Sequence, residues 1–439
     1  MQKFNTFYFE KFEFDFTSLK AKFFYSFDEI EFFEEEIDFK DSDFVLRENI
    51  DEEIIINLLF HAHISIWISY YKLFPTKNLV VKSWFLDEEN INFWKKFYRN
   101  GLWEFFIKND FNFNDILDFQ NSLEKEKKFP LIRGLGGSSL LMWWWWKDSI
   151  VSSILLEEEG QNFDAFVFGK IDRIKQNTLE VLWKKTMLVK RKISENLFEL
   201  NKKWYYNWHV PITWIIAFIS LISAYLYNYK NIVLSNESSA DEPNIVWQGL
   251  KINHQYSKSA EFENDFRKYV EKNIWDINYY SKLRNLWELE IAEIFSKKAH
   301  KYFETFSSCN RNFIITPPLT PPSKGGEQEK SLPLQGGDLE GVNWCCNCEK
   351  CAFVYLILSA NLEEKEMIKI FGQNLFENKN LEETYAWLLG LTKNKPFECV
   401  GTYDESRISF KKVLEKYEKN SWENKKIPYI LEKFKKEIK

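Results

Sequence analysis

The sequence predicts an α/β protein with a doubly wound parallel sheet, preceded by a β-rich N-terminal unit and followed by a helical, cysteine-containing region. Three observations lead to this fold class. Polar and aromatic residues alternate near the N-terminus, short apolar runs alternate with helical patterns from about residue 129, and four of six cysteines crowd into residues 345–351. The 439 residues allow two or three units with separate cores. Aromatic residues make up 18% of the chain, so we expect an aromatic-rich core.

The first unit is placed at residues 1–127. Residues 4–39 alternate between polar and aromatic side chains, a period of two that predicts antiparallel strands. Two apolar helices should follow, over residues 52–74 and 90–106, and should pack on that sheet. His61 and His63 would diverge on the first of these helices, so we expect structural roles for both.

The second unit, residues 128–311, should hold the parallel sheet. Apolar runs at residues 163–167, 178–182 and 231–234 predict buried strands, and residues 210–227 predict an apolar helix. That helix approaches the length of a membrane span, but its Pro, Thr and Ser content favours a helix buried inside the domain. Ligands of doubly wound sheets bind at the carboxyl ends of the strands. The loops that follow Ile132 and Leu234 are therefore the expected binding region.

A Pro- and Gly-rich stretch separates this unit from the last one. Residues 316–341 cannot sustain a helix or a strand interior, so residues 312–343 are expected to form a flexible insert. Residues 344–439 should then form a helical region that begins with the cysteine cluster.

Charge and targeting signals narrow the function. The formal net charge of −6 disfavours a nucleic-acid-binding surface. The first ten residues show no basic segment followed by an apolar one, which favours the cytoplasm. In that reducing compartment, crowded cysteines are typical of metal ligands rather than disulfides.

A Gly-rich stretch and a helix start suggest a phosphate-binding loop. Gly136 and Gly137 allow a close backbone approach, and Lys147-Asp148-Ser149 opens an apolar helix whose N-terminus favours anions. Residues 138–146, which include four Trp, separate these two parts. We expect this segment to be an insert that either bulges out or leaves the loop as an inactive scaffold.

Polar side chains also gather after the apolar run that ends at Leu234. They are Ser235, Asn236 and Glu237, followed by Asn253, His254, Gln255, Tyr256, Ser257 and Lys258. Planar donors for anionic groups come from Arg267, Arg284 and Arg311.

The cysteines suggest a metal site. Cys345, Cys348 and Cys351 recur every three residues, and a fourth thiolate would come from Cys309 or Cys346. Four thiolates suit a structural Zn²⁺, the same spacing also suits an iron–sulfur cluster, and reduced thiols in the core are the remaining reading.

These stretches resemble the PP-loop ATP pyrophosphatase group, which carries S-G-G-x-D-S, and within it the UDP-N-acetylmuramoyl-L-alanyl-L-glutamate epimerase family. That family carries Gly-Gly-Gly-Lys-Asp-Ser, S-N-E-x-S-A and N-H-Q-Y-S-K-S, and residues 395–401 resemble its K-P-F-E-C-V-G segment, in which Glu398 would face the substrate or end a helix. The family has Gly where Cys346 stands, which favours Cys309 as the fourth ligand.

The resemblance implies an isomerase of peptidoglycan precursor synthesis that uses ATP and Mg²⁺ and releases AMP and pyrophosphate. An acyl-adenylate would neutralise the α-carboxylate of the terminal glutamate, so that a base can remove the α-proton. In this reading Gly136, Gly137, Lys147, Asp148 and Ser149 bind the nucleotide, His254, Lys258 and Glu237 move protons, and Ser235, Asn236, Asn253, Gln255, Tyr256, Ser257, Arg267, Arg284 and Arg311 bind the substrate. A PP-loop tRNA sulfur transferase and an inactive PP-loop scaffold are the alternatives.

Overall fold

The computed structural model describes residues 3–112, 117–122, 137–203, 206, 210–243, 245–247, 250–274, 277–309, 343–392, 400–419 and 426–438. Its main sheet has ten strands. In spatial order they are β12 (Asn278–Ser281), β9 (Asn231–Leu234), β6 (Ser139–Met142), β7 (Phe163–Phe168), β8 (Thr186–Lys192), β3 (Glu31–Asp38), β2 (Lys20–Phe27), β1 (Thr6–Asp15), β4 (Asn78–Val81) and β5 (Asp118–Asn121). A separate hairpin joins β10 (Ile245–Trp247) to β11 (Leu250–Ile252).

Five neighbouring strands form the predicted parallel sheet. Strands β12, β9, β6, β7 and β8 are all parallel to their neighbours within this group. Numbered in chain order, these strands lie in the order 5-4-1-2-3, which is that of a doubly wound sheet. The prediction of an α/β fold with a doubly wound parallel sheet is therefore confirmed.

The N-terminal strands extend this sheet. β1, β2 and β3 pair antiparallel, as the alternation predicted, and β3 then pairs antiparallel with β8. At this junction the Arg191 guanidinium donates to Glu35 at 2.6 and 3.1 Å, and the Tyr70 hydroxyl donates to the same carboxylate at 2.7 Å. Because Glu35 is fully buried, these bonds satisfy a charge that would otherwise be costly there. One sheet thus runs through both halves.

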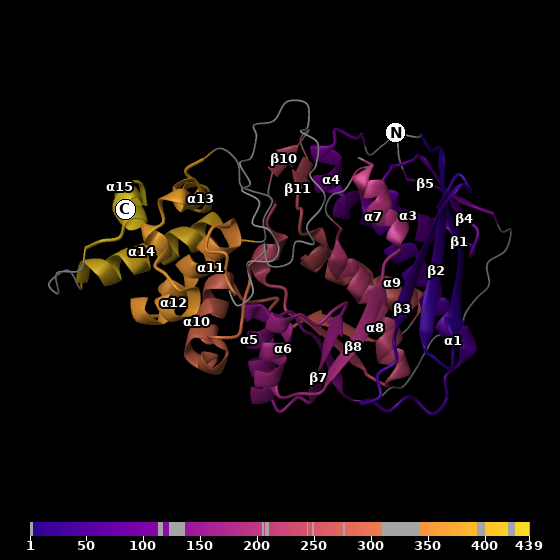
Figure 1. Cartoon of the computed structure of the whole chain (residues 1–439), viewed down its shortest axis with the longest axis horizontal. Helices are drawn as coiled ribbons and strands as arrows, with labels where there is room; N and C mark the ends of the chain where they lie inside the picture. The colour runs from indigo at the N-terminus through magenta and orange to yellow at the C-terminus, as the bar shows by residue number, and fades with distance from the viewer. Residues whose placement is uncertain are drawn as a thin grey trace.

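The helices of the sheet region are α1 (Glu52–Ile66), α2 (Ile68–Tyr71), α3 (Glu88–Gly101), α4 (Trp103–Lys108), α5 (Lys147–Glu158), α6 (Arg173–Leu182), α7 (Glu195–Lys202), α8 (Ile212–Leu226) and α9 (Ala260–Asn273). Those of the C-terminal half are α10 (Glu288–Lys298), α11 (Glu349–Ser359), α12 (Glu364–Phe371), α13 (Glu382–Leu388), α14 (Tyr403–Lys419) and α15 (Tyr429–Ile438), and Figure 1 shows them gathered at the end of the molecule opposite β1 and β2. The predicted helical region at residues 344–439 contains α11 to α15, whereas α10 precedes it.

Alternate residues of the central strands enter two different cores. On β6, Leu140 and Met142 belong to the core that contains α1, α8 and α9, while Leu141 belongs to the core that contains α5, α10 and α11. Since successive strand side chains point to opposite faces, helices cover both faces of the parallel sheet. This arrangement leaves the strand ends as the accessible part of the sheet.

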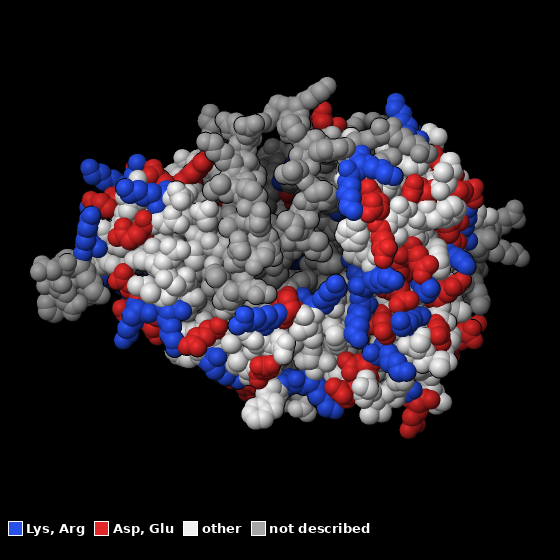
Figure 2. Space-filling model, in the orientation of Figure 1, with Lys and Arg blue, Asp and Glu red and all other residues white. Residues whose placement is uncertain are grey.

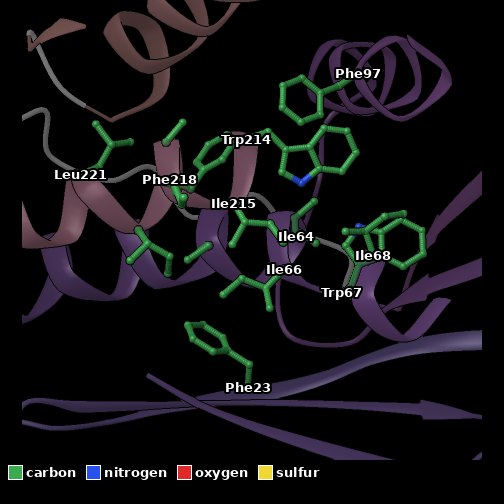
Figure 3. Packing of buried hydrophobic residues seen from close by; sticks show 14 of the residues in the cluster. Phe23, Ile64, Ile66, Trp67, Ile68, Phe97, Trp214, Ile215, Phe218 and Leu221 are labelled. Carbon is green, nitrogen blue, oxygen red and sulfur yellow. The ribbon is translucent and has the colours of Figure 1, made fainter. Parts of the chain in front are cut away.

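The apolar helix α8 lies inside the protein, as predicted. Every residue from Trp214 to Leu226 is buried. Figure 3 shows Trp214 and Ile215 of α8 beside Ile64 of α1, with Ile66 of α1 facing Phe23 of the sheet. Within the described ranges, Glu52–Tyr71 is the one helical stretch long and apolar enough to cross a membrane, and 89% of its apolar window is buried in this layer.

Two predicted segments, one strand and one insert, differ from the structure. Residues 178–182 form the end of α6, whose N-cap Asp172 accepts a hydrogen bond from the Lys175 amide at 2.9 Å. A short apolar run does not distinguish a strand from a helix, and here the capping Asp172 decides for the helix. The segment 138–146 is not an insert either, because residues 139–142 are the central strand β6.

The two histidines of α1 point apart and are buried, as expected. The Nδ1 of His61 lies 2.9 Å from the Tyr269 hydroxyl of α9, whereas the Nε2 of His63 lies 3.1 Å from the Phe24 carbonyl oxygen of the sheet. Burial lowers the pKa of each imidazole to about 3, from the ordinary 6.5. Both side chains are therefore neutral parts of the core.

These histidines predict a loss of stability in acid. Unfolded imidazoles bind protons below pH 6.5, while the folded ones stay neutral down to about pH 3, so the free energy of unfolding should fall throughout this window. We expect the double variant H61Q/H63Q to lose several kcal/mol at neutral pH but to show a flatter dependence on pH. Urea titrations from pH 7 to pH 4 measure this slope. The exposed His300 supplies the control H300Q, and an unchanged slope in the double variant would contradict the assignment.

Candidate active site

The strand order places a binding region between β6 and β9. These strands are neighbours in the sheet. From β6 the chain continues to β7 on one side, and from β9 it continues to β12 on the opposite side. A doubly wound sheet binds its ligands at such a switch point, outside the carboxyl ends of the strands. The relevant chain ends are Met142 and Leu234.

One wall of the site is the turn from β6 into α5. Trp143 to Trp146 make this turn, and α5 begins at Lys147 with no side-chain hydrogen bond at its N-cap, Trp146. The fully buried Lys147 ammonium forms ion pairs with Asp148 and Glu288. Burial by itself would lower the pKa of Lys147, but the two carboxylates raise it above its ordinary value. Lys147 is therefore a charged group, and its two carboxylate partners fix its position.

The predicted glycine loop does not form next to this turn. Gly137 is exposed and precedes β6, whereas Lys147 follows that strand. A strand advances about 3.3 Å per residue, so β6 alone separates the two ends by about 10 Å. Gly137 thus lies at the amino edge of the sheet and cannot share a loop with Lys147, Asp148 and Ser149. The Gly-Gly pair was interpreted as part of a phosphate-binding loop. The strand that leads into Lys147-Asp148-Ser149 is β6, which follows these glycines in the sequence.

The second wall follows β9. Ser281 of β12 fixes the chain here, since its hydroxyl accepts from the Asn236 amide at 2.7 Å and donates to the Asn236 carbonyl oxygen at 2.6 Å. The Ser235 hydroxyl is buried and has no hydrogen-bond partner within the described part of the chain. Burial and the nearby Asp148 raise the pKa of Glu237, while Lys258 opposes this shift. Glu237, Asp148 and Lys258 therefore form one electrostatic group.

The third wall is residues 253–259. Asn253 ties it to the second wall, because its side chain donates to the Ala240 carbonyl oxygen at 2.7 Å and accepts from the Gln255 amide at 2.8 Å. His254, Gln255 and Ser257 are buried, and among described residues the Gln255 Oε1 has no partner. Lys258 meets the first wall, with its Nζ 4.9 Å from the centroid of the Trp146 ring. Tyr256 instead packs in the core between Phe97 and Phe262.

The predicted arginines have different positions. Arg284 donates to the Glu263 carboxylate at 2.9 Å, to the Lys258 carbonyl oxygen at 2.9 Å and to the Glu237 carbonyl oxygen at 3.2 Å. Its guanidinium thereby joins the second and third walls and acts as a positioning residue. Arg267 lies on the exposed side of α9, where it donates to Asn264 at 2.6 Å. Gly136, Arg311 and Glu398 lie outside the described residues.

Two buried charges of the site had no predicted role. Glu288 opens α10 and pairs with Lys147, and the Lys350 ammonium of α11 lies 3.8 Å from the same carboxylate. The Lys350 Nζ is also 5.6 Å from the Trp146 ring centroid. In the sequence Lys350 stands between Cys348 and Cys351. The position of this lysine between two predicted metal ligands was the feature of the sequence that could have indicated a role for residues 348–351 in the active site.

Four cysteines converge beside this wall. The Sγ atoms of Cys309, Cys345, Cys348 and Cys351 all lie within 4.8 Å of one another, and the Cys348–Cys351 and Cys345–Cys351 pairs are 3.5 and 3.7 Å apart. A tetrahedral zinc ion with Zn–S bonds of about 2.3 Å would place its sulfurs about 3.8 Å apart. An iron–sulfur cluster has several ions between its ligands and needs a wider spacing. The thiol positions therefore fit a single ion.

Cys346 points away from this group. Its thiol donates to the Phe371 carbonyl oxygen at 3.2 Å, and its φ of 53° lies in the left-handed region that glycine adopts most easily. Of the two predicted fourth ligands, the structure therefore brings Cys309 to the other three. The same segment contacts the first wall, since the Ser307 amide donates to the Trp145 carbonyl oxygen at 3.2 Å.

The different environments of Arg284 and Arg267 predict different effects of mutation. R284M should lower the free energy of unfolding by about 3 kcal/mol, because it leaves the buried Glu263 carboxylate without its partner. The matched variant R267M should change it by less than about 0.5 kcal/mol, as is usual for exposed positions. Denaturant titration measures both. Equal effects would contradict the positioning role.

Two family models match the chain. The MurL N-terminal domain model matches residues 1–282 and the MurL C-terminal domain model matches residues 328–438. A Xanthomonas oryzae pv. oryzae relative is 29% identical over 348 residues, which cover 79% of this chain and 72% of that protein. A Micromonospora relative is 33% identical over 230 residues, which cover 52% of this chain and 46% of that protein. A Salinispora tropica relative is 33% identical over 51% of this chain and 44% of its own length.

All three relatives carry the name UDP-N-acetyl-alpha-D-muramoyl-L-alanyl-L-glutamate epimerase. Epimerases are isomerases, and an isomerase is the class of enzyme that was predicted for this chain. Since the N-terminal model alone covers more than half of the 439 residues, the chain belongs to the MurL family of epimerases.

Proposed function

We propose that this protein inverts the terminal L-glutamate of UDP-N-acetylmuramoyl-L-alanyl-L-glutamate to D-glutamate in the cytoplasm, in peptidoglycan precursor synthesis, and that ATP and Mg²⁺ drive the step. The names of the relatives support the substrate. The observation that carries the proposal is the group of charges at the strand switch point, where Asp148 is buried and Glu237 and Lys258 are half-buried near it. A carboxyl group such as Glu237, whose pKa is raised by burial and by a neighbouring carboxylate, is typical of acid–base catalysis.

The chemistry requires an activated substrate. Removing the α-proton beside an ionised carboxylate would concentrate a second negative charge on the same group. ATP would supply activation of this carboxylate as an acyl-adenylate, which removes its charge. The side chains of the protein then have to hold the substrate, exclude water and exchange one proton on each face of the α-carbon.

The residues at the switch point fit these tasks. The uncapped first turn of α5, with Ser149, would bind phosphate oxygens in the manner of a PP-loop protein, assisted by Lys147 and Lys258. Asp148 supplies carboxylate oxygen of the kind that Mg²⁺ prefers. A raised pKa makes Glu237 a stronger base near neutral pH, and we propose that it exchanges the proton on one face. His254 and Lys258 are our candidates for the other face.

The substrate would lie between the second and third walls. Ser235 and Gln255 each have a buried oxygen without a partner in the described part of the chain, as expected for groups that bind a ligand. We propose that they bind the substrate together with Asn236 and Ser257.

An inactive scaffold is the second candidate. With β6 ending at Met142, Trp144 to Trp146 occupy the three positions before Lys-Asp-Ser, which are glycines in the family pattern. Three bulky side chains there would hinder the approach of phosphate to the backbone. A tRNA sulfur transferase gains no comparable support, since basic and acidic side chains are interspersed over the described surface visible in Figure 2.

We also propose that Cys309, Cys345, Cys348 and Cys351 bind one structural Zn²⁺. Their mutual distances support this ligand set. The ion would connect the segment before residue 310 to the start of α11 and so fix Lys350 beside Glu288. It takes no part in the proposed reaction.

A product assay separates the candidates. Purified protein incubated with ATP, Mg²⁺ and the L-glutamate-ended precursor should form AMP and the D-glutamate-ended precursor in equal amounts. E237Q should lower the rate by a factor of about 100 or more, as is usual for loss of a catalytic base. Chiral analysis of the hydrolysed product and AMP quantification measure both. AMP without D-glutamate would indicate another acceptor, and no turnover would favour the scaffold.

Metal analysis tests the cysteine site separately. The purified protein should contain one equivalent of zinc, and C348S should lose it and unfold at a lower temperature. C346S is the matched control and should keep the metal, because Cys346 bonds to Phe371 instead. Equal zinc contents in the two variants, or an iron content in place of zinc, would contradict the proposed site.

A further inference from the structure

Trp146 is the last of the four tryptophans in the turn between β6 and α5, and two lysines contact its ring. Trp143 donates to the Thr178 hydroxyl at 3.4 Å, and Trp145 has the Lys175 ammonium 4.3 Å from its ring centroid. The Trp146 indole Nε1 is buried but bonds to no group in the described residues. A buried donor without a partner costs free energy, so hydrogen bonding does not fix this ring in its place.

Two ammonium groups converge on the Trp146 ring. The Nζ of Lys258 lies 4.9 Å and that of Lys350 lies 5.6 Å from the ring centroid, and these lysines come from different parts of the chain. Trp146 is also the N-cap of the twelve-residue helix α5. An uncapped helix N-terminus and converging ammonium groups are features that attract an anion. The uncharged aromatic ring of Trp146 is in contact with both ammonium groups at this helix start.

We propose that the Trp146 ring is a gate that occupies the polyphosphate position of the site and must move away before a phosphate group can bind. The inference rests on the proposed function, because it concerns the same nucleotide site. The ring is held by cation–π contacts and packing, which a phosphate group would replace with charge-assisted hydrogen bonds to Lys258 and the first turn of α5. Trp146 thereby reduces the affinity for the phosphate portion of the nucleotide and leaves the rest of the site unchanged.

The gate predicts tighter anion binding when the ring is removed. W146A should bind inorganic pyrophosphate about tenfold or more tightly than the unmodified protein, because two cation–π contacts no longer compete with the anion. W146F keeps a ring and should resemble the unmodified protein. The remote control is W183G, at an exposed Trp183 whose φ of 55° glycine tolerates. Titration calorimetry with pyrophosphate at fixed Mg²⁺ measures these affinities.

A second measurement uses the unmodified sequence, in case W146A folds poorly. In protein labelled with 5-fluorotryptophan, the resonance that is missing from W146F belongs to Trp146. Saturating pyrophosphate should shift this ¹⁹F resonance more than those of the other tryptophans. An unshifted resonance in a protein that binds pyrophosphate would overturn the gate.

The outcomes for the gate and for the proposed function are distinct. Equal pyrophosphate affinities of W146A and the unmodified protein would overturn the gate, while the product assay could still show ATP-dependent epimerisation. If neither protein binds pyrophosphate or ATP, both the gate and the nucleotide site fail. If W146A binds pyrophosphate more tightly than the unmodified protein and W146F and W183G do not, the result supports both the gate and the nucleotide site.

Discussion

The buried ion network of Lys147, Asp148, Glu288 and Lys350 is the constraint on which the site depends. Lys147 begins α5, Glu288 begins α10 and Lys350 lies at the start of α11, so three helix starts meet through charged side chains at one end of the parallel sheet. Moving these charges out of water is costly, and only their mutual attraction offsets the cost. Loss of one partner would leave an uncompensated charge, so the network holds the helix starts in one geometry.

The other parts of the site are built around this network. Arg284 holds the backbone at Glu237 and Lys258 from the side of β12, and the cysteine segment contacts the turn after β6 through Ser307 and Trp145. The C-terminal helices therefore do more than cover one face of the sheet. They contribute Lys350 to the site, next to Cys351 in the sequence and 3.8 Å from the Glu288 carboxylate. Residues from three distant parts of the chain are needed to complete the group of charges.

The sequence predicted the features that depend on local pattern. The alternation in residues 4–39 gave the antiparallel strands, and the apolar run of α8 gave a buried helix. The polar stretches around Glu237 and Lys258 do meet at the switch point. Cys309 lies with the other three thiols, whereas Cys346, whose backbone is left-handed, bonds to the Phe371 carbonyl oxygen instead.

The sequence could not predict features that depend on register and long-range pairing. Because of the Gly-Gly pair at 136–137, the phosphate-binding loop was predicted before β6 instead of after it. The apolar residues 139–142 alone do not indicate whether they form a strand or an insert in a loop. Arg267 and Arg284 look alike in the sequence, yet only Arg284 faces the site. The pairing of Lys350 with Glu288 joins residues that only the folded chain brings together.

The central claim is that the charged groups at the strand switch point exchange the α-proton of a glutamate residue. Solvent deuterium exchange tests it most directly. In D₂O with ATP and Mg²⁺, the precursor should gain one deuterium at the α-carbon of its terminal glutamate, and E237Q should slow this gain strongly while still binding pyrophosphate. Inversion without deuterium incorporation, or undiminished incorporation by E237Q, would contradict the account.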